Sequence, residues 1–330
     1  MSMLLEIQHL KKSFLVPGHK GSKAAHLKAV DGVDLQIAAG ETLGLVGESG
    51  CGKSTVGKLI LQLLKADEGQ ILYRGTNLVP LSARQMRPWR RQIQMIFQDP
   101  FSSLNPRMTV GESLSEPLNI HQLCKAADRP EHIRELLHQV GLDAAAANRY
   151  PHEFSGGQRQ RISIARALAV QPELIIADEP VSALDLSVQA QIINLLRDLQ
   201  RHHQLSFLFI AHDLAVVEHV SDRIAVMYLG RIVEIAAADE LYQRPHHPYT
   251  EALLRAIPRP DPDLAGRPAP LRGELPSPLN PPTGCTFHPR CPYATDLCHQ
   301  QPPPMEEIAP GHQTRCFHHK LVGKFLKDRK

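Results

Sequence analysis

The residues best suited to chemistry form one glycine-rich run, Gly47-Glu48-Ser49-Gly50-Cys51-Gly52-Lys53-Ser54-Thr55. The run follows an apolar segment, residues 42–46, and precedes residues 56–65, whose apolar side chains recur at helical spacing. Glycines let backbone N–H groups approach phosphate oxygens, and a helix N-terminus adds its positive dipole end. This context predicts a P-loop in which Lys53 reaches the β- and γ-phosphates and Ser54 takes a Mg²⁺ position. A glycine turn that fits the pattern by chance is the alternative.

A second candidate site lies at the end of another apolar run. Residues 174–177 are continuously apolar and lead directly into Asp178 and Glu179. Such a run is typical of a buried parallel strand, and open α/β sheets bind ligands at the carboxyl ends of their strands. Asp178 suits the metal shell of a Mg-bound nucleotide, and Glu179 suits a general base that orients water.

Three more side chains are weaker candidates when each is taken alone. Gln98 ends the short apolar segment 93–97, and its amide could contact Mg²⁺ or an attacking water. His212 follows the apolar segment 205–210; a lone histidine there is usually structural, but the predicted acidic edge favours a phosphate contact. Phe14 follows two lysines and could stack on an adenine ring, although such a residue more often belongs to the core.

A helix start and a loop add further candidates. Ser155, with Gln158 three residues later, fits an N-cap and a capping box. The intervening Gly156-Gly157 pair makes this helix start a candidate anion site, with an ordinary capped helix as the alternative. Residues 182–185 form a loop that ends in Asp185 and precedes a helical pattern.

Length and composition are those of a cytosolic globular protein, or of one bound to a membrane from the cytosolic side. The 330 residues are 22% charged and carry a net charge of +3, which does not by itself imply a nucleic-acid partner. No apolar run approaches the ~20 residues needed to cross a bilayer. The first residues lack a basic segment followed by a long apolar one, so we expect no signal peptide.

The chain changes in composition from residue 245 onward. This tail holds more than half of the 27 prolines, which predicts a loop-rich segment that a metal or covalent staple would help to stabilise. It also holds four of the six cysteines, Cys285, Cys291, Cys298 and Cys316. In a reducing compartment four thiols favour a metal site over disulfides. Their spacing names no cofactor, so a [4Fe–4S] cluster, Zn²⁺ with help from His288, and reduced thiols all stay open.

Together these motifs resemble, in order and spacing, the ATP-binding subunits of ABC transporters. The resemblance covers residues 4 to 240 and includes the P-loop, Gln98, Ser155–Gln158, Asp178–Glu179, residues 182–185 and His212. Within this family, the dipeptide and oligopeptide importers are most similar, in residues 13–30, in Ile96-Phe97-Gln98-Asp99-Pro100-Phe101-Ser102-Ser103-Leu104-Asn105-Pro106 and in the tail from Tyr242 to Cys291.

The resemblance implies an α/β fold of the ABC type, a P-loop NTPase with a RecA-like core, an antiparallel β subdomain and a helical subdomain at about residues 101–170. We expect the ATP-binding domain at residues 1–244 and an irregular Pro/Cys-rich extension at residues 245–330. The extension of the resembled importers carries a [4Fe–4S] cluster. This implies that Cys285, Cys291, Cys298 and Cys316 are cluster ligands.

The resemblance to ABC transporter subunits also implies a mechanism in which two ATPase subunits pack head to tail around two ATP molecules. Each γ-phosphate then meets residues 47–55 of one subunit and the Ser155–Gln158 signature of the other. The implied roles are adenine stacking for Phe14, Mg²⁺ binding for Ser54, Gln98 and Asp178, action on water for Glu179, a γ-phosphate contact for His212, and a place in the nucleotide site for Asp185.

The implied partners are a paralogous ATPase subunit, two transmembrane permease subunits and, indirectly, a periplasmic peptide-binding protein. The implied location is the cytoplasmic face of the bacterial inner membrane, and the implied function is ATP-driven import of dipeptides. The alternatives are an importer of oligopeptides or nickel, an exporter, and a soluble ABC ATPase acting on DNA or ribosomes. ABC ATPases that act on DNA need a long coiled-coil insertion, and those that act on ribosomes usually fuse two ATPase halves. This chain has no sustained heptads and only one ATPase half, so we expect no nucleic-acid partner.

Overall fold

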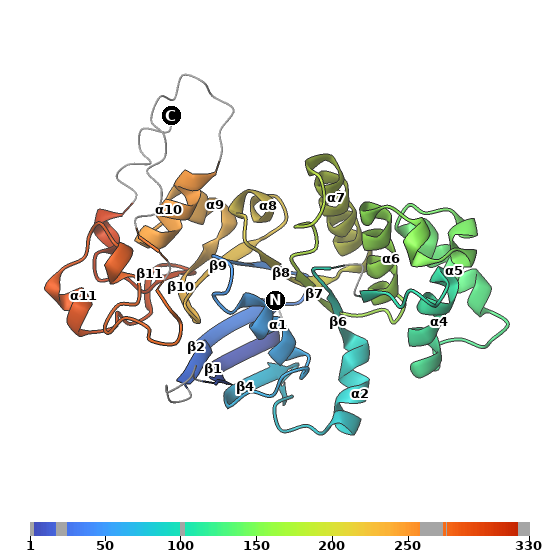
Figure 1. Cartoon of the computed structure of the whole chain (residues 1–330), viewed down its shortest axis with the longest axis horizontal. Coiled ribbons are helices and arrows are strands. Elements are labelled where there is room, and N and C mark those ends of the chain that lie inside the picture. The colour runs from blue at the N-terminus through green and yellow to red at the C-terminus, as the bar shows by residue number, and fades with distance from the viewer. Residues whose placement is uncertain (1–2, 18–24, 100–102, 258–272, 275, 323–330) are drawn as a thin grey trace, which may run out of the picture. The chain divides into compact units, whose positions relative to one another are not determined.

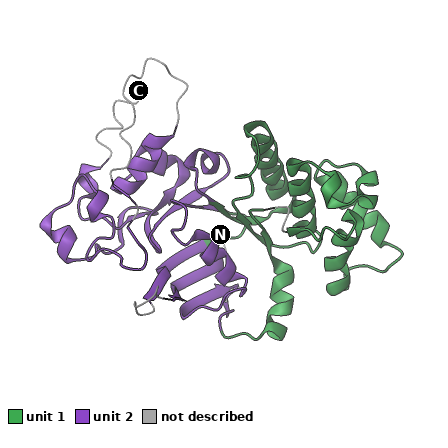
Figure 2. Cartoon of the chain, viewed as in Figure 1, with its two compact units in different colours: residues 1–3, 37–41, 80–210 green, residues 4–36, 42–79, 211–330 purple. Residues whose placement is uncertain are grey.

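The computed structural model describes residues 3–17, 25–99, 103–257, 273–274 and 276–322. The chain falls into two units (Figure 2). Unit 1 comprises Met1–Met3, Ile37–Glu41 and Pro80–Ile210, and unit 2 comprises Leu4–Gln36, Thr42–Val79 and Ala211–Lys330. Several predicted segments lie outside the described residues: residues 18–24 and 100–102 of the importer-like stretches, and residues 258–272, 275 and 323–330 of the expected extension.

Unit 1 combines parallel strands with helices (Figure 1). Its elements are α2 (Ala83–Gln92), β6 (Ile93–Ile96), α4 (Val110–Ile120), α5 (Arg129–Gln139), η1 (Ala144–Asn148), η2 (Pro151–Glu153), α6 (Gly156–Leu168), β7 (Leu174–Asp178), α7 (Leu186–His203) and β8 (Ser206–Ala211). Strand β7 lies between β6 and β8 and is parallel to both, with Leu174 opposite Ile93 on one side and Ser206 on the other. Every residue of β7 and β8 is buried, as a continuous apolar run predicts for parallel strands.

Helices α4, α5 and α6 of unit 1 pack against one another. Side-chain caps begin two of them. The Thr109 hydroxyl accepts from the N–H of Glu112 at α4, and the Ser155 hydroxyl accepts from the N–H of Gln158 at α6. Both are capping boxes, so the predicted cap at Ser155 is confirmed.

Unit 2 holds two groups of strands, with helices and the C-terminal segment (Figure 1). Its elements are β1 (Met3–Val16), β2 (Ala25–Ala38), β3 (Thr42–Val46), α1 (Lys53–Ile60), β4 (Glu68–Tyr73), β5 (Thr76–Asn77), α8 (Leu214–Glu218), β9 (Arg223–Tyr228), β10 (Arg231–Ala237), α9 (Ala238–Gln243), α10 (Pro248–Ala256), η3 (His288–Arg290), α11 (Asp296–Gln300), β11 (Glu306–Ala309), β12 (His312–Thr314) and η4 (His319–Leu321).

The first group has the order β2-β1-β4-β5, with β4 antiparallel to both β1 and β5. The second has the order β11-β12-β10-β9-β3, in which β3 is parallel to β9 and the other neighbours are antiparallel. All of β3 is buried. This strand leads directly into the predicted P-loop, so the loop starts from a fixed point in the core.

Helix α1 is shorter than the sequence predicts. The apolar spacing over residues 56–65 suggests a helix to Lys65, whereas α1 ends at Ile60. Gln62 takes a left-handed conformation, with φ of 53°, which stops the helical hydrogen-bond pattern. Leu63, the next apolar position, is 51% exposed, so periodicity here overstated the length of the helix.

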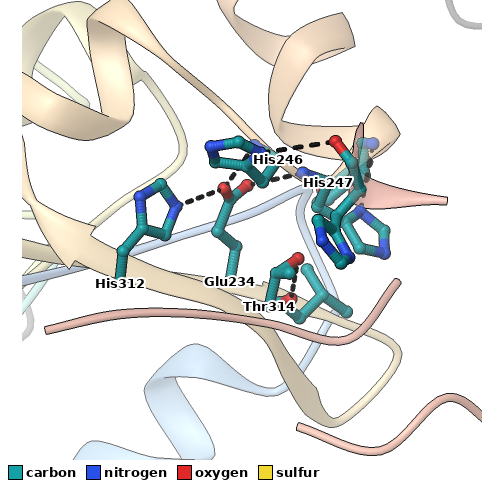
Figure 3. Close-up of polar contacts among 8 residues, drawn as sticks. Glu234, His246, His247, His312 and Thr314 are labelled. Atoms are coloured by element: carbon teal, nitrogen blue, oxygen red, sulfur yellow. Dashed lines mark hydrogen bonds and ion pairs between the residues drawn. The ribbon is translucent and has the colours of Figure 1, made fainter. Parts of the chain in front are cut away.

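The C-terminal segment is joined to β10 through a buried carboxylate, Glu234 (Figure 3). Its Oε1 accepts hydrogen bonds from the Nε2 of His312 at 2.8 Å and the backbone N–H of His246 at 2.5 Å. Its Oε2 accepts one from the backbone N–H of His247 at 3.1 Å. Strand β12 pairs with β10 at the same place, with Thr314 opposite Glu234. Strands β11 and β12 were not predicted from the sequence.

We expect the substitution Glu234→Ala to destabilise unit 2 strongly. It leaves two backbone N–H groups, one of them buried, and the His312 ring without an acceptor, which costs about 3–5 kcal/mol. Chemical denaturation of the full chain measures the loss. The exposed Asp239 provides the control, since Asp239→Ala should stay within about 0.5 kcal/mol of the wild type. Equal losses for the two variants would contradict this assignment.

Candidate nucleotide-binding site

The glycine-rich loop connects β3 to α1 and is held close to neighbouring backbone. Gly52 is the N-cap of α1 and has φ of 109°. A Cβ at Gly52 would lie 2.1 Å from the carbonyl oxygen of Ala29, and one at Gly47 would lie 2.2 Å from that of Met227. No side chain fits at such distances, so these two positions need glycine for space as well as for conformation.

Lys53 begins α1, and its side chain turns back over the loop. Only 4% of Lys53 is exposed. Its Nζ donates to the carbonyl oxygens of Gly47 at 2.7 Å and Glu48 at 3.0 Å. Burial raises the pKa of the neighbouring Cys51 thiol, and the nearby Lys53 charge opposes that shift. Cys51 therefore packs as a neutral side chain, while the ammonium lies at the centre of the loop.

The rest of the loop is more accessible. Ser49 and Gly50 are exposed, and Ser54 and Thr55 are half-buried in the first turn of α1. Backbone N–H groups at the start of a helix have no partner within the helix and suit an anionic ligand. The structure therefore brings residues 47–55 together in one loop that has an accessible side.

In unit 1, the predicted acidic strand end is formed at β7. Asp178 is the last residue of that strand and is 4% exposed. Glu179 follows with φ of 46°, a costly conformation for a residue other than glycine, and its N–H donates to Ile210 at 2.9 Å. The Nε2 of Gln98 donates to the Oε2 of Glu179 at 3.0 Å. Gln98 and Glu179 are therefore direct neighbours, a pairing that the sequence did not indicate.

The signature residues lie at the N-terminus of α6. Ser155 and Gln158 are exposed, and Gly156 and Gly157 are half-buried. A Cβ at Gly157 would lie 2.5 Å from Cγ1 of Val188 in α7, so α6 needs glycine here to approach α7. The start of α6 is therefore accessible, as an anion site requires, and the N–H of Gln158 is taken by the Ser155 hydroxyl.

Asp185 caps a helix. Its carboxylate accepts from the N–H of Val188 at 2.9 Å and from the hydroxyl of Ser187 at 2.7 Å, and it thereby begins α7. These hydrogen bonds lower the pKa of Asp185. The cap gives this residue a structural role that the sequence prediction did not include.

The two remaining nucleotide candidates both belong to unit 2. His212 is exposed just after the end of β8. Phe14 is half-buried near the end of β1, and the Nζ of Lys12 lies 5.6 Å from the centre of its ring. Phe14 is therefore not a fully buried core residue, and part of its surface is open to a ligand.

The four cysteines of the tail line one small pocket in unit 2. Cys285, Cys291, Cys298 and Cys316 share it with Phe287, His247 and His318, and the cavity volume is about 10 Å³. Burial, the largest cause, and the nearby thiols raise the pKa of Cys291 to about 11 and that of Cys316 to about 12. Within the described residues, no three ligand side chains are spaced to hold a metal ion. The four thiols match a metal site in chemistry, while their spacing would have to adjust.

Sequence reasoning missed a contact between this tail and the P-loop. The guanidinium of Arg290 binds both carboxylate oxygens of Glu48, at 2.7 and 3.0 Å. The hydroxyl of Tyr249 accepts the backbone N–H of Glu48 at 2.8 Å. Both residues lie in the importer-like tail, but no pattern in the sequence linked them to a loop some two hundred residues earlier.

Two family models match the chain. The model described as "ABC transporter" matches residues 30–182, and the model described as "Oligopeptide/dipeptide transporter, C-terminal region" matches residues 233–298. Among curated proteins, a "Putative peptide import ATP-binding protein" of Brucella ovis is 55% identical over 314 residues, covering 95% of this chain and 97% of its own. The "Oligopeptide transport ATP-binding protein AppF" of Bacillus subtilis is 53% identical, covering 95% and 96%.

The chain belongs to the ATP-binding subunits of ABC transporters.

Solved structures confirm the predicted ABC-type α/β fold of this ATPase. The ATP-binding cassette MJ0796, in a dimeric post-hydrolysis state bound to ADP and Pi, is similar with a TM-score of 0.64 and 28% identity. That match covers 71% of this chain and 99% of the cassette. Among the described residues of the ATPase, no helix has the length and apolar character needed to span a membrane.

We expect Gly52→Ala to disrupt the loop. A methyl group there would meet the Ala29 carbonyl, so the backbone must move and stability should fall by roughly 2–4 kcal/mol, with loss of ATP binding. Thermal unfolding and nucleotide titration measure the two effects.

Gly50 is the matched control, because it also has a positive φ, of 80°, but has open space around its Cβ position. The change Gly50→Ala should therefore lower the free energy of unfolding by only about 1 kcal/mol. A Gly52 variant that behaves like the Gly50 variant would show that the close approach to Ala29 does not matter.

Proposed function

We propose that this ATPase powers the import of short peptides, with dipeptides as the preferred class. The observation that carries the proposal is the combination, in one chain, of a P-loop with a C-terminal region of the oligopeptide/dipeptide transporter type. Relatives named for peptide import and oligopeptide transport support it, at 53–55% identity over almost the full chain.

The nucleotide site in this proposal uses the residues predicted from the sequence. The amides of residues 47–55 bind the phosphates of ATP, and the Lys53 ammonium moves from the loop carbonyls to the β- and γ-phosphates. Phe14 stacks on adenine. Ser54, Gln98 and Asp178 serve Mg²⁺. His212 contacts the γ-phosphate.

Glu179 acts on the attacking water in this scheme. Its hydrogen bond from Gln98 supports the role, since an amide held beside the carboxylate restricts its orientation. Residues 155–158 act on the nucleotide of a second ATPase subunit. Asp185 lies near the interface between the two ATPase subunits. The exposure of the α6 N-terminus and the dimeric state named for MJ0796 support this arrangement.

The partners proposed are a paralogous ATPase, two transmembrane permease subunits and a periplasmic peptide-binding protein that acts through them. The site of action is the cytoplasmic face of the bacterial inner membrane. The helices around residues 101–150 would pass the movement of the ATPase to the permeases. They belong to the helical subdomain at about residues 101–170, within an ATP-binding domain at residues 1–244. Residues 245–330 form the extension.

A metal centre at the four tail cysteines is part of the proposal. The four thiols line one small pocket, where Cys298 is buried and the other three are partly buried. They would repel one another when ionised, and a cationic centre would hold all four as thiolates. A [4Fe–4S] cluster suits a set of four cysteines, with Zn²⁺ as the alternative. The centre would staple a proline-rich segment, and no step of ATP hydrolysis involves it.

The transport function is tested by isolating the chain from bacterial membranes and identifying its partners by mass spectrometry. We expect permease subunits and a second ATPase. The reconstituted complex, with its binding protein, should then take up labelled dipeptides faster than longer peptides or nickel. Recovery with ribosomes or DNA, and without permeases, would instead favour a soluble ABC ATPase.

Glu179→Gln should lower ATP turnover by about 10²–10⁴-fold, because the amide cannot accept a proton from water. ATP binding should be retained, since the shape of the side chain is preserved. Turnover and binding are both measured on the assembled transporter. Glu173, just before the other end of β7, gives the control Glu173→Gln, which should turn over normally. Normal turnover in the Glu179 variant would remove Glu179 from this role.

Anaerobic purification should give a brown protein with visible absorption and with iron and sulfide bound. Replacing Cys285, Cys291, Cys298 or Cys316 by serine should remove the colour, because each supplies one thiolate. Cys124 lies outside the four-cysteine pocket, so Cys124→Ser should keep it. Stoichiometric zinc without iron would establish the alternative, and absence of both metals would exclude a metal centre.

A further inference from the structure

Glu48 is the second residue of the P-loop, and its carboxylate, its backbone N–H and its carbonyl oxygen each have a hydrogen-bond partner. Its carboxylate receives the two N–H groups of Arg290, its backbone N–H donates to the hydroxyl of Tyr249, and its carbonyl oxygen accepts from Lys53. Two of these partners come from the C-terminal segment, and the third is the lysine assigned to the phosphates. Glu48 therefore connects the tail to the loop through directed hydrogen bonds.

The partners of Glu48 are themselves rigidly placed. The Arg290 side chain is 4% exposed, and its guanidinium carbon lies 5.9 Å from the ring centre of Tyr228. The rings of Tyr228, Tyr249 and Phe287 are fully buried and lie within 4.7–5.5 Å of one another. Because buried aromatic rings leave little room for side-chain movement, both hydrogen-bonding groups are fixed in position before a nucleotide binds.

Arg290 also belongs to the segment that carries two of the four cysteines. It ends η3, between Cys285 and Cys291. The N–H of His288 donates to the carbonyl of Cys285 at 3.0 Å, and the N–H of Cys291 donates to that of His288 at 3.2 Å. This tight turn leaves Arg290 little freedom of its own. A shift of either cysteine therefore moves the guanidinium that holds Glu48.

We propose that Arg290 is a positioning residue for nucleotide binding. Through Glu48 it sets the shape of the P-loop, and it couples ATP affinity to the conformation of residues 285–291. The proposal rests on the nucleotide site proposed above. An arginine–carboxylate pair with two hydrogen bonds fixes orientation as well as distance, which a single hydrogen bond does not. When the pair is broken, Glu48 and the carbonyl that binds Lys53 lose their side-chain anchor, and the loop must be ordered by the nucleotide itself.

The coupling must act in both directions. If the tail raises the affinity of the loop for ATP, then ATP binding must stabilise the tail by the same factor. Residues 285–291 should therefore become more protected from hydrogen exchange when nucleotide binds at residues 47–55. This effect needs Arg290, and it does not depend on which metal, if any, the cysteines hold.

A double-mutant cycle on the full chain tests the proposal, with Mg-ATP titrated by calorimetry. We expect Arg290→Gln and Glu48→Gln each to weaken ATP binding by about 5- to 20-fold. The double variant should bind ATP no more weakly than the weaker-binding of the two single variants, because both substitutions remove the same interaction. Arg290→Lys keeps the charge without the two-point contact, and its affinity should lie between those of the wild type and Arg290→Gln.

Arg231 is the matched control. It also binds a carboxylate of unit 2 with two N–H groups, to the Oδ2 of Asp31 at 2.7 and 3.0 Å, and lies outside the Glu48 contacts. Arg231→Gln should lower thermal stability without changing ATP affinity. Arg290→Gln should lower both thermal stability and ATP affinity. It should also abolish the nucleotide-induced protection of residues 285–291 from hydrogen exchange.

Wild-type ATP affinity in Arg290→Gln, or additive effects in the double variant, would overturn the inference. So would unchanged protection of residues 285–291 in that variant. The nucleotide site itself is tested separately with Lys53→Ala, which should bind ATP far more weakly than any Arg290 variant. If the wild-type chain binds no ATP, or Lys53→Ala binds it normally, the proposed site fails and this inference fails with it.

Discussion

The structure of unit 2 depends on how closely the backbone of the P-loop approaches its neighbours. Gly47 and Gly52 pass so near the carbonyls of Met227 and Ala29 that a single added carbon has no room. This approach fixes the path of the chain between β3 and α1. The start of α1, where N–H groups lack partners within the helix, lies beside the exposed residues Ser49 and Gly50. We propose that the phosphate site is formed in this way, by backbone geometry, before any ligand binds.

The C-terminal segment contributes to this arrangement although it lies far from the loop in sequence. It is tied to the core at Glu234, through hydrogen bonds from the tail, and at Glu48, through Arg290. Two buried or partly buried carboxylates thus receive donors from a region that is rich in proline and poor in regular structure. Hydrogen bonds to these two carboxyl groups replace part of the apolar packing that such a segment cannot supply.

The sequence was most informative where function demands a local pattern. The P-loop, the acidic strand end and the capped helix at Ser155 each lie within a few residues, so spacing alone predicted them. The end of α1 was not predictable in this way, because the left-handed turn at Gln62 interrupts a good apolar period. The contact between Glu48 and Arg290 spans 242 positions and was equally hidden, since tertiary packing decides it. The shared pocket of the four cysteines was expected from their number but not from their spacing.

The central claim is that ATP binds in the loop of residues 47–55 and takes the Lys53 ammonium away from the loop carbonyls. A structure of the full chain with Mg²⁺ and a non-hydrolysable ATP analogue tests this directly. The account predicts the β- and γ-phosphates against the amides of this loop, with Lys53 bonded to phosphate. Nucleotide bound elsewhere, or Lys53 still bonded to both Gly47 and Glu48 beside a bound nucleotide, would contradict it.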